Sequence, residues 1–377
     1  MKEVVIVSAC RTAIGAFGGT LKDSNAAVIG SVIMKEAIKR AGIDPAIIDD
    51  VRYGCCMEPA DALNVARVSA LLAGGVEHMS GVAYQVPNAR WGCRLQDTVF
   101  VDAMIHALHC GSHIIPHPED GPVDATQPPL SMCVGKPYIM GQTAEFIAQH
   151  MDISRKEMDE VALRSQNNAE RANDDGSFKD EIVPMEIPRR KKTPLIYARD
   201  EHFRPGLTME QLEKLPPAFV PKIGKVTAGN ASGINDGSAA MVIMSADKAK
   251  ELGIQPLAKI VATGRGACHP SVMGLSPVPA VKNLLDRHSM KISDFELVEL
   301  NEAFAAQYIG CERDLGLNRE ITNVNGSGIG LGHPVGATGC RIMVTLLYAM
   351  KNRGKSLGLA TLCGGGGVSM ACALEMM

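Results

Sequence analysis

Aromatic residues are scarce in this sequence, and neither sign of charge predominates. Of the 377 residues, 4% are aromatic and one is a tryptophan. The 38 Lys and Arg nearly balance the 41 Asp and Glu, for a net charge of −3. This provides neither the basic surface of a nucleic-acid-binding protein nor the polybasic face of a membrane-surface protein. No apolar run reaches the roughly 18 residues that cross a bilayer. We therefore expect no nucleic-acid partner and no membrane span.

Cysteine is present, but without the spacing of a disulfide framework. The 11 cysteines are odd in number and include no CxxC pair. We interpret most of them as small buried residues in a reducing compartment, which predicts a cytoplasmic protein. The apolar run at residues 4–7 is too short for the core of a signal peptide and is soon followed by Arg11.

Apolar residues and glycine are abundant, in a pattern of alternating strands and helices. Hydrophobic residues make up 46% of the chain and glycine contributes 38 residues, which provides for a large core with tight turns. Runs rich in β-branched residues predict buried strands, and helical spacing predicts the segments between them. The expected strands are residues 4–8, 49–53, 240–245, 258–262, 296–300, 322–325, 357–362 and 368–374, and the expected helices are 26–41, 63–73, 155–171, 278–288, 303–312 and 337–351. The sequence therefore predicts an α/β fold.

The chain divides into three parts by composition. Residues 76–228 lose the strand–helix rhythm and concentrate Pro, His and Gly. We expect residues 1–75 to form an N-terminal half and residues 76–228 a loop domain with its connection. Residues 229–377 would complete the N-terminal half and form the C-terminal half, with a boundary near residue 255.

An internal repeat relates the two halves. Each copy has a helix, a turn and a short strand, and each later reaches a glycine-rich segment. The second copy takes 64 positions from Leu300 to Gly364, whereas the first takes 21 from Tyr53 to Gly74. A missing piece of roughly thirty residues is about one strand–helix–strand unit. Self-comparison therefore predicts that the first half is truncated between residues 72 and 76.

Three strand-to-helix junctions in the last 80 residues carry reactive or polar groups. His333 lies in a glycine-lined turn before a helix, Cys363 precedes four glycines, and Asn301 follows a strand. Because the carboxyl ends of neighbouring strands meet at one sheet edge, we expect one pocket. A thiol, an imidazole and free backbone N–H groups suit thioester chemistry. Each signal alone also fits a structural turn, and their combination favours a site.

Five segments resemble the thiolase family. They occur in family order and span nearly all of the chain: residues 8–15 (SACRTAIG), 227–237 (TAGNASGINDG), 301–304 (NEAF), 325–339 (NGSGIGLGHPVGATG) and 363–367 (CGGGG). The resemblance implies two similar five-stranded α/β halves in a layered arrangement, with an inserted loop domain. Sterol carrier-like thiolases and ketoacyl synthases share this fold, but the contexts of His333 and Cys363 look like those of true thiolases.

The resemblance also implies a function and roles for individual residues. It implies an acyl-CoA C-acyltransferase that condenses two acetyl-CoA or cleaves 3-ketoacyl-CoA with coenzyme A, without a permanently bound cofactor. His333 matches the residue that draws the proton from a nucleophilic cysteine, and Cys363 matches the cysteine that takes or returns the α-proton. Asn301 looks like the residue that holds a water as an oxyanion donor. The backbone N–H of Gly365 resembles half of a second oxyanion hole.

Further positions match coenzyme A contacts in the family. Ala228 and Ser232 resemble contacts to the pantetheine, and Arg204 resembles the residue beside the adenine. The positions that resemble the apolar walls are Phe219, Met140, Ala303 and Phe304. Ile139 stands where many relatives carry histidine, so that family contact is not carried over.

The family's nucleophile segment, V-N-x-x-C-[GA]-S-G, is not found. After Leu72 the chain continues directly into residues that in relatives lie beyond the nucleophile. Cys55, Cys56 and Cys93 flank this point, and none has the S-G context. Either the printed chain omits a segment that the working protein has, or the protein is a deletion form. We favour the omission, because removing a central strand and a buried helix would expose apolar surface and unpaired strand edges.

Two other clusters carry alternative interpretations. His106, His109, Cys110, His113 and His117 lie within twelve residues and could form a zinc site. No carboxylate is spaced to orient the imidazoles, so we favour a solvated loop and no metal. The basic run at residues 189–192 is more consistent with a solvated turn than with a clamp for coenzyme A phosphate.

A second hypothesis from another class remains open at this point. The chain could be a non-catalytic coenzyme A-binding or assembly subunit with a thiolase fold. The resemblance otherwise implies acetyl-CoA or 3-ketoacyl-CoA and coenzyme A as partners, a role in fatty acid metabolism, and a homodimer or homotetramer. Acyl chain length and the direction of the reaction are not encoded in any motif found.

Overall fold

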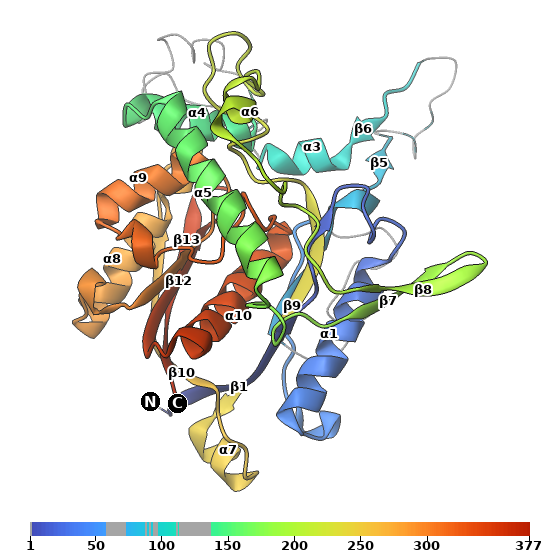
Figure 1. The fold of residues 1–377 in the computed structure, drawn as a ribbon, viewed down its shortest axis with the longest axis vertical. Coiled ribbons are helices and arrows are strands. Elements are labelled where there is room, and N and C mark those ends of the chain that lie inside the picture. Colours follow the sequence, from blue (N-terminus) through green and yellow to red (C-terminus); the bar gives the residue numbers. More distant parts are fainter. Residues whose placement is uncertain are drawn as a thin grey trace.

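A computed structural model describes residues 2–57, 73–86, 89, 92, 97–110, 112 and 137–377. Its ribbon is shown in Figure 1. Among these residues, no helix is long and apolar enough to cross a membrane.

A large mixed sheet organises the structure. Its hydrogen-bonded path runs β11 (Leu297–Leu300), β12 (Leu357–Cys363), β13 (Val368–Met376), β10 (Ala258–Ala267), β1 (Val4–Arg11), β9 (Asn235–Ser245), β4 (Ala73–His78) and β3 (Tyr53–Gly54). The short β2 (Gly15–Ala16) pairs with β9. Strands β1 and β10 pair antiparallel and join the two halves, with Val4 opposite Ile260. The predicted α/β class is confirmed, and the described residues contribute four strands from each half to this path.

Strand β4 occupies the place where the sequence predicted a truncation. It pairs antiparallel with β9 on one side and parallel with β3 on the other. The expected unpaired edge in the middle of the sheet is therefore not present among the described residues. Only 18 residues separate Gly54 from Ala73, which is too few for both the predicted helix 63–73 and a counterpart of the 19-residue helix α10. Most of helix 63–73 lies outside the described residues.

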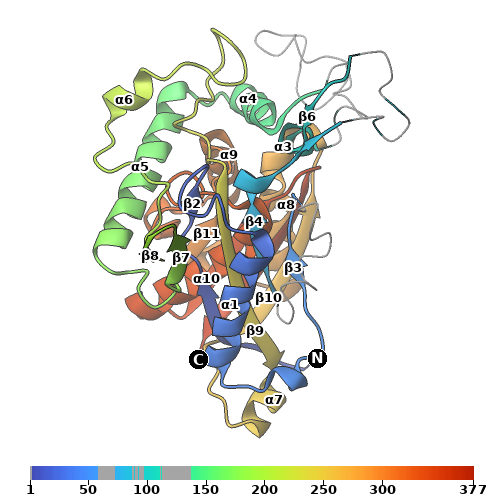
Figure 2. The ribbon, with the colours of Figure 1, turned by 90° about the vertical axis from the view of Figure 1, so that its right-hand side faces the viewer.

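Helices cover the sheet, and α10 (Val335–Arg353) lies centrally. It packs against β4 and β9 of the first half and against β11 and β12 of the second. Helix α1 (Ala26–Ala41) covers β1, β4 and β9, and α8 (Pro277–His288) covers β10, β12 and β13. Figure 2 shows α1 lying along β9. The second half thus supplies the helix that both halves bury.

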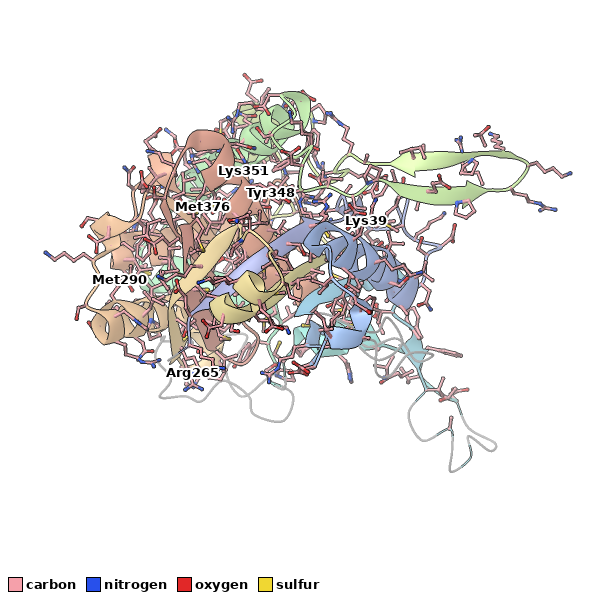
Figure 3. All side chains as sticks on the ribbon, turned by 90° about the horizontal axis from the view of Figure 1, so that it is seen from below. Lys39, Arg265, Met290, Tyr348, Lys351 and Met376 are labelled. Atoms are coloured by element: carbon pink, nitrogen blue, oxygen red, sulfur yellow. The ribbon has the colours of Figure 1, made fainter. Side chains whose placement is uncertain are left out.

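The end of α10 is tied to the first half through Tyr348. Its hydroxyl donates to the Ala9 carbonyl over 2.9 Å and accepts from Arg40 Nη1 over 3.2 Å. Lys351 Nζ lies 5.9 Å from the centre of the Tyr348 ring. Figure 3, seen from below, labels Tyr348 and Lys351 on this helix. These contacts link α10, β1 and α1.

The insertion contributes helices and a hairpin. Its described elements include α3 (Ala103–Leu108), α4 (Met140–His150), α5 (Arg155–Asp174), α6 (Met209–Glu213), β5 (Tyr84–Gln85), β6 (Val101–Asp102), β7 (Met185–Arg189) and β8 (Lys192–Tyr197). The hairpin β7–β8 extends away from the body in Figures 1 and 3. Residues 189–192 form its exposed turn, as predicted. The predicted helix 155–171 is confirmed as α5, which begins at a capping box of Ser154 and Glu157.

Some predicted elements differ in extent. Helix α9 is Ala305–Leu315 in place of the predicted 303–312, and β3 is shortened to Tyr53–Gly54 from the predicted 49–53. Helix α7 (Ala246–Glu251) was not predicted. Residues 322–325 do not form a strand, and only Thr322 bridges to Val298. Both of these strand segments, 49–53 and 322–325, were predicted from runs of only four or five residues. In such short runs the available partner strands, rather than local composition, decide whether a strand forms.

Candidate active site

Three predicted residues meet at one edge of the sheet. Strands β11 and β12 run parallel, so their carboxyl ends lie side by side. Asn301 follows β11, and its backbone N–H donates to the Thr361 carbonyl over 3.1 Å. Cys363 is the last residue of β12. His333 joins them from the turn before α10, where its side chain meets that of Asn301.

Hydrogen bonds define the tautomer of His333. Its Nδ1 lies 2.7 Å from Thr338 Oγ1, and that hydroxyl donates its single proton to the Pro334 carbonyl over 2.9 Å. The hydroxyl must therefore accept from His333, which places the ring proton on Nδ1. Nε2 keeps its lone pair and lies 3.4 Å from Asn301 Nδ2, which donates to it. The nitrogen beside Asn301 is thus the basic one.

The environment keeps this imidazole neutral. Burial, and to a lesser extent the positive charge of Arg341, lower the pKa of His333 from 6.5 to about 3. The imidazole is therefore neutral at ordinary pH, and the lone pair of Nε2 is not occupied by a proton. The backbone of His333 is held as well, because its N–H donates to Asn235 Oδ1 over 2.9 Å.

Arg341 is a polar residue on α10 that the sequence reading did not single out. Its side chain is 1% exposed, and Nη2 donates to Asn301 Oδ1 over 3.2 Å and to Ser327 Oγ over 3.3 Å. Nη1 lies 3.6 Å from Glu299 Oε2. Because Arg341 holds the oxygen of the Asn301 amide, the amide nitrogen faces His333. The sequence does contain a signal for this residue, because Arg341 is an arginine within an otherwise apolar helix segment.

Cys363 leads into a tight glycine turn. Gly364 N–H donates to the Val368 carbonyl over 2.8 Å, and Gly367 N–H donates to the Gly364 carbonyl over 3.1 Å. Gly366 has φ +81°, a conformation that favours glycine. Burial raises the pKa of the Cys363 thiol from 9.0 to about 12. No hydrogen bond joins Cys363 to His333, although they share the sheet edge.

The residues predicted as apolar walls lie together. The Phe219 and Phe304 rings meet edge to face with centres 6.2 Å apart. A Cβ on Gly141, next to Met140, would be 2.3 Å from the Phe219 ring. Ser232 N–H donates to the Ala303 carbonyl over 2.9 Å.

The other proposed coenzyme A contacts are more peripheral. Ala228 and Arg204 are exposed, and the Arg204 backbone N–H donates to Gln166 Oε1 over 2.8 Å. Ile139 is half-buried and precedes α4 as its N-cap. The structure therefore brings Phe219, Phe304, Met140 and the Ser232–Ala303 pair near one another, with Arg204 at the surface.

The first half meets the site through Glu77. This buried carboxylate accepts from the backbone N–H groups of Cys56 over 2.9 Å, Met57 over 3.1 Å and Gly336 over 2.8 Å. It thereby ties β4 to the first turn of α10. Burial, followed by the charge of Glu77, raises the pKa of both Cys55 and Cys56 to about 12. Neither thiol is activated by these surroundings.

The predicted histidine cluster is described only in part. The rings of His106 and His109 meet edge to face, 6.5 Å apart, and His109 Nδ1 lies 2.8 Å from the Ile105 carbonyl. His113, His117 and Cys93 lie outside the described residues. Within the part of the chain that is described, no group of three side chains could hold a metal ion.

Comparison with known proteins gives consistent matches over the whole chain. The family model "Thiolase, N-terminal domain" matches residues 4–74 and 113–247, and "Thiolase, C-terminal domain" matches residues 254–376. An acetyl-CoA acetyltransferase of Syntrophomonas wolfei is 42% identical, and one of Cupriavidus necator is 41% identical, with each alignment covering 100% of both chains. The first alignment runs over 419 positions, 42 more than this chain has residues.

Solved structures show the same likeness. The acetyl-CoA acetyltransferase of Bacillus anthracis superposes with a TM-score of 0.90 at 39% identity, covering 100% of this chain and 99% of the other. Human mitochondrial 3-ketoacyl-CoA thiolase in complex with CoA superposes with a TM-score of 0.87 at 34% identity, covering 100% and 98%. In the alignment with the Syntrophomonas wolfei protein, 42 positions of the relative have no counterpart in this chain.

Proposed function

Because this chain belongs to the thiolase family, we propose that it is an acyl-CoA C-acyltransferase. It would condense two acetyl-CoA to acetoacetyl-CoA or cleave 3-ketoacyl-CoA with coenzyme A. Relatives named acetyl-CoA acetyltransferase and 3-ketoacyl-CoA thiolase support this reaction class. The observation that carries the proposal is the hydrogen-bonded series Thr338–His333–Asn301, which presents a neutral base at the sheet edge where Cys363 ends β12.

The proposed roles follow from proton balance. The buried thiol of Cys363 has a raised pKa and does not ionise alone near neutral pH. In the family a neighbouring histidine draws the proton from the separate, acyl-accepting cysteine. We assign that task to His333 Nε2. Cys363 exchanges the α-proton of the second substrate. Asn301 holds a water beside His333 that donates to one developing oxyanion, and the backbone N–H of Gly365 donates to the other. Arg341 fixes the orientation of the Asn301 amide.

The proposed coenzyme A site uses the apolar group described above. Phe219, Met140, Ala303 and Phe304 form the walls along the pantetheine, while Ala228 and Ser232 contact it. Arg204, being exposed, is available to the adenine end. Coenzyme A thioesters enter and leave as substrates, and we propose no permanently bound cofactor.

We also propose a setting for the reaction. Free thiols among the described cysteines fit a reducing compartment, so we place the protein in the cytoplasm, in fatty acid metabolism. We propose a homodimer or homotetramer, supported by exposed apolar side chains such as Val99 and Phe100, which a second copy could cover.

Turnover in both directions tests the proposed function. Purified protein is mixed with acetoacetyl-CoA and coenzyme A, and separately with acetyl-CoA alone, and products are quantified by chromatography. We expect acetyl-CoA in the first mixture and acetoacetyl-CoA in the second, both abolished in His333→Ala. Tight binding of coenzyme A by calorimetry with no turnover in either mixture would establish the non-catalytic alternative instead.

A further inference from the structure

A surface cavity of about 250 Å³ lies where α5, the last residue of α10 and residues 319–325 meet. Half of its lining side chains are arginines. The lining consists of Arg164, Asn168, Arg171, Glu320, Val324 and Arg353. None of these residues belongs to the proposed catalytic group or to the proposed coenzyme A site. We call this space the arginine cavity.

The arginines reach the cavity from two helices that are distant in the sequence (Figure 1). On α5, Arg164, Asn168 and Arg171 are spaced by four and then three positions, which puts them on one face of the helix. Arg353 is the last residue of α10. The fold therefore gathers positive charges that no local sequence pattern connects.

Hydrogen bonds hold the three guanidinium groups in place. Arg164 and Arg171 each donate through Nη2 to a backbone carbonyl of residues 322–324, Arg164 over 2.8 Å. Arg353 Nη2 donates to Asn325 Oδ1 over 3.2 Å. Within the described part of the chain, Nη1 and Nε of these arginines have no hydrogen-bond partner. These donors can therefore bind a ligand at a small cost in side-chain entropy.

Ion pairs do not balance the positive charge of the cavity. Among the described residues, no carboxylate forms an ion pair with any of its three arginines. Glu320 is the one carboxylate in the lining, which leaves an excess of two positive charges. Asp175 attracts Arg171 and Arg353 from outside the lining, and its Oδ1 accepts from the Ser177 N–H over 2.9 Å. Burial, and then the charge of Arg171, lower the pKa of Arg353, while Asp175 acts in the opposite direction.

We propose that the arginine cavity binds a phosphate dianion, either inorganic phosphate or the phosphomonoester group of a small metabolite. Guanidinium groups donate paired N–H bonds to phosphate oxygens, and the excess of two positive charges matches the charge of such a ligand near neutral pH. The volume lies below the roughly 300–1,000 Å³ of pockets for drug-sized ligands, which favours a small anion. This inference does not depend on the proposed function, because no proposed catalytic residue takes part in it.

Titration calorimetry with inorganic phosphate tests the proposal. The full chain is titrated in a phosphate-free buffer, with sodium chloride keeping the ionic strength constant so that general screening does not change. We expect one saturable site whose affinity falls roughly tenfold in Arg171→Gln and in Arg353→Gln, because each loses a charged hydrogen bond to the anion. Glu320→Gln removes the opposing charge and should raise the affinity severalfold. Arg265→Gln is the matched control, since Arg265 is exposed on β10, outside the cavity (Figure 3).

A second pair of ligands separates the two sources of the phosphate group. Coenzyme A carries a 3′-phosphomonoester that dephospho-coenzyme A lacks. A preference for coenzyme A that is lost in Arg353→Gln supports a bound phosphomonoester. Binding of inorganic phosphate without this preference supports the free anion.

Three results would overturn the proposal. The first is the absence of saturable phosphate binding together with equal affinities for coenzyme A and dephospho-coenzyme A. The second is an unchanged phosphate affinity in Arg171→Gln and Arg353→Gln, and the third is an equal loss in Arg265→Gln. Circular dichroism and urea unfolding verify that the variants are folded. A fall in stability with unchanged phosphate affinity would show that the arginines only tie α5 and α10 to residues 319–325.

Discussion

A histidine that removes a thiol proton has to be neutral at the pH of the reaction. The surroundings of His333 keep it neutral. Burial and the charge of Arg341 disfavour its protonated form. Thr338 fixes the proton of His333 on Nδ1. The sequence pattern did not predict this role, and the available indication was the place of Thr338 five residues after His333. The positions of His333 and Cys363 could be predicted because glycine-rich turns mark them, and that of Asn301 because it follows a strand. The role of Arg341 could not be predicted, because it depends on which helix face meets β11.

The depressed pKa of His333 has a measurable effect on stability. The folded pKa of about 3 lies below the ordinary 6.5, so the unfolded chain binds a proton first as pH falls. The contribution of His333 to the free energy of unfolding should be complete above pH 6.5 and decline toward pH 3, by up to about 1.4 kcal/mol per pH unit. Urea unfolding at pH 7, 6 and 5 should show a shallower decline in His333→Gln than in the unsubstituted protein. Equal slopes would contradict the buried, neutral imidazole.

Arg341 allows the charge and the hydrogen bond to be separated. Arg341→Met removes both, so the pKa of His333 should rise and kcat should fall roughly tenfold or more with the loss of a charged hydrogen bond. Arg341→Lys keeps the charge and should keep the pKa while still lowering kcat. Proton NMR of the His333 ring gives the pKa directly. A purely structural role predicts the same His333 pKa in all three proteins.

At the scale of elements, the first turn of α10 fits closely against the first half. A Cβ on Gly75 would be 2.2 Å from the Gly336 carbonyl oxygen, and one on Gly336 would be 2.6 Å from Cys55 Cα. The glycine-rich segment at residues 73–76, recognised in the sequence only as a repeat, is therefore a helix-packing surface. Sequence pattern located α10 to within two residues at each end, but not the strands against which it would pack.

Two glycines of α10 make this packing testable. In Gly336→Ala the new methyl group meets backbone atoms, so unfolding free energy should fall by about 1–3 kcal/mol. In Gly339→Ala the nearest atom is Leu362 Cδ1 at 3.8 Å, an ordinary contact, and stability should rise by up to about 1 kcal/mol from helix propensity. Denaturant unfolding measures both. Equal effects of the two substitutions would show that α10 does not approach β3 and β4 as described.

Strand prediction worked where burial on both faces produced continuous apolar runs. Strand β1 is buried from Val5 to Arg11, and β12 covers the predicted 357–362. The strand predicted at residues 322–325 does not form, because Thr322 makes one bridge to Val298 and the chain then turns toward the site. At that point the glycine-rich turn, rather than strand propensity, determines the backbone.

At the scale of the whole molecule, the shortened first half still closes a continuous sheet. We expected a deletion to leave a central strand unpaired, yet β4 is paired on both sides. The 18 residues between Gly54 and Ala73 instead leave no room for a second helix as long as α10, which packs against both halves. The sheet therefore gives no sign of a missing strand among the described residues. The argument for an omitted segment now rests on the missing helix and the missing nucleophile segment.

The measurement that tests the account most directly is the denatured intact mass before and after mixing with acetyl-CoA. Because an omitted segment is favoured, the account predicts a starting mass above 40.1 kDa by roughly one strand–helix–strand unit, and the gain of one acetyl group that is lost again when free coenzyme A is added. A starting mass near 40.1 kDa that does not change on mixing with acetyl-CoA would contradict acyl transfer by this protein.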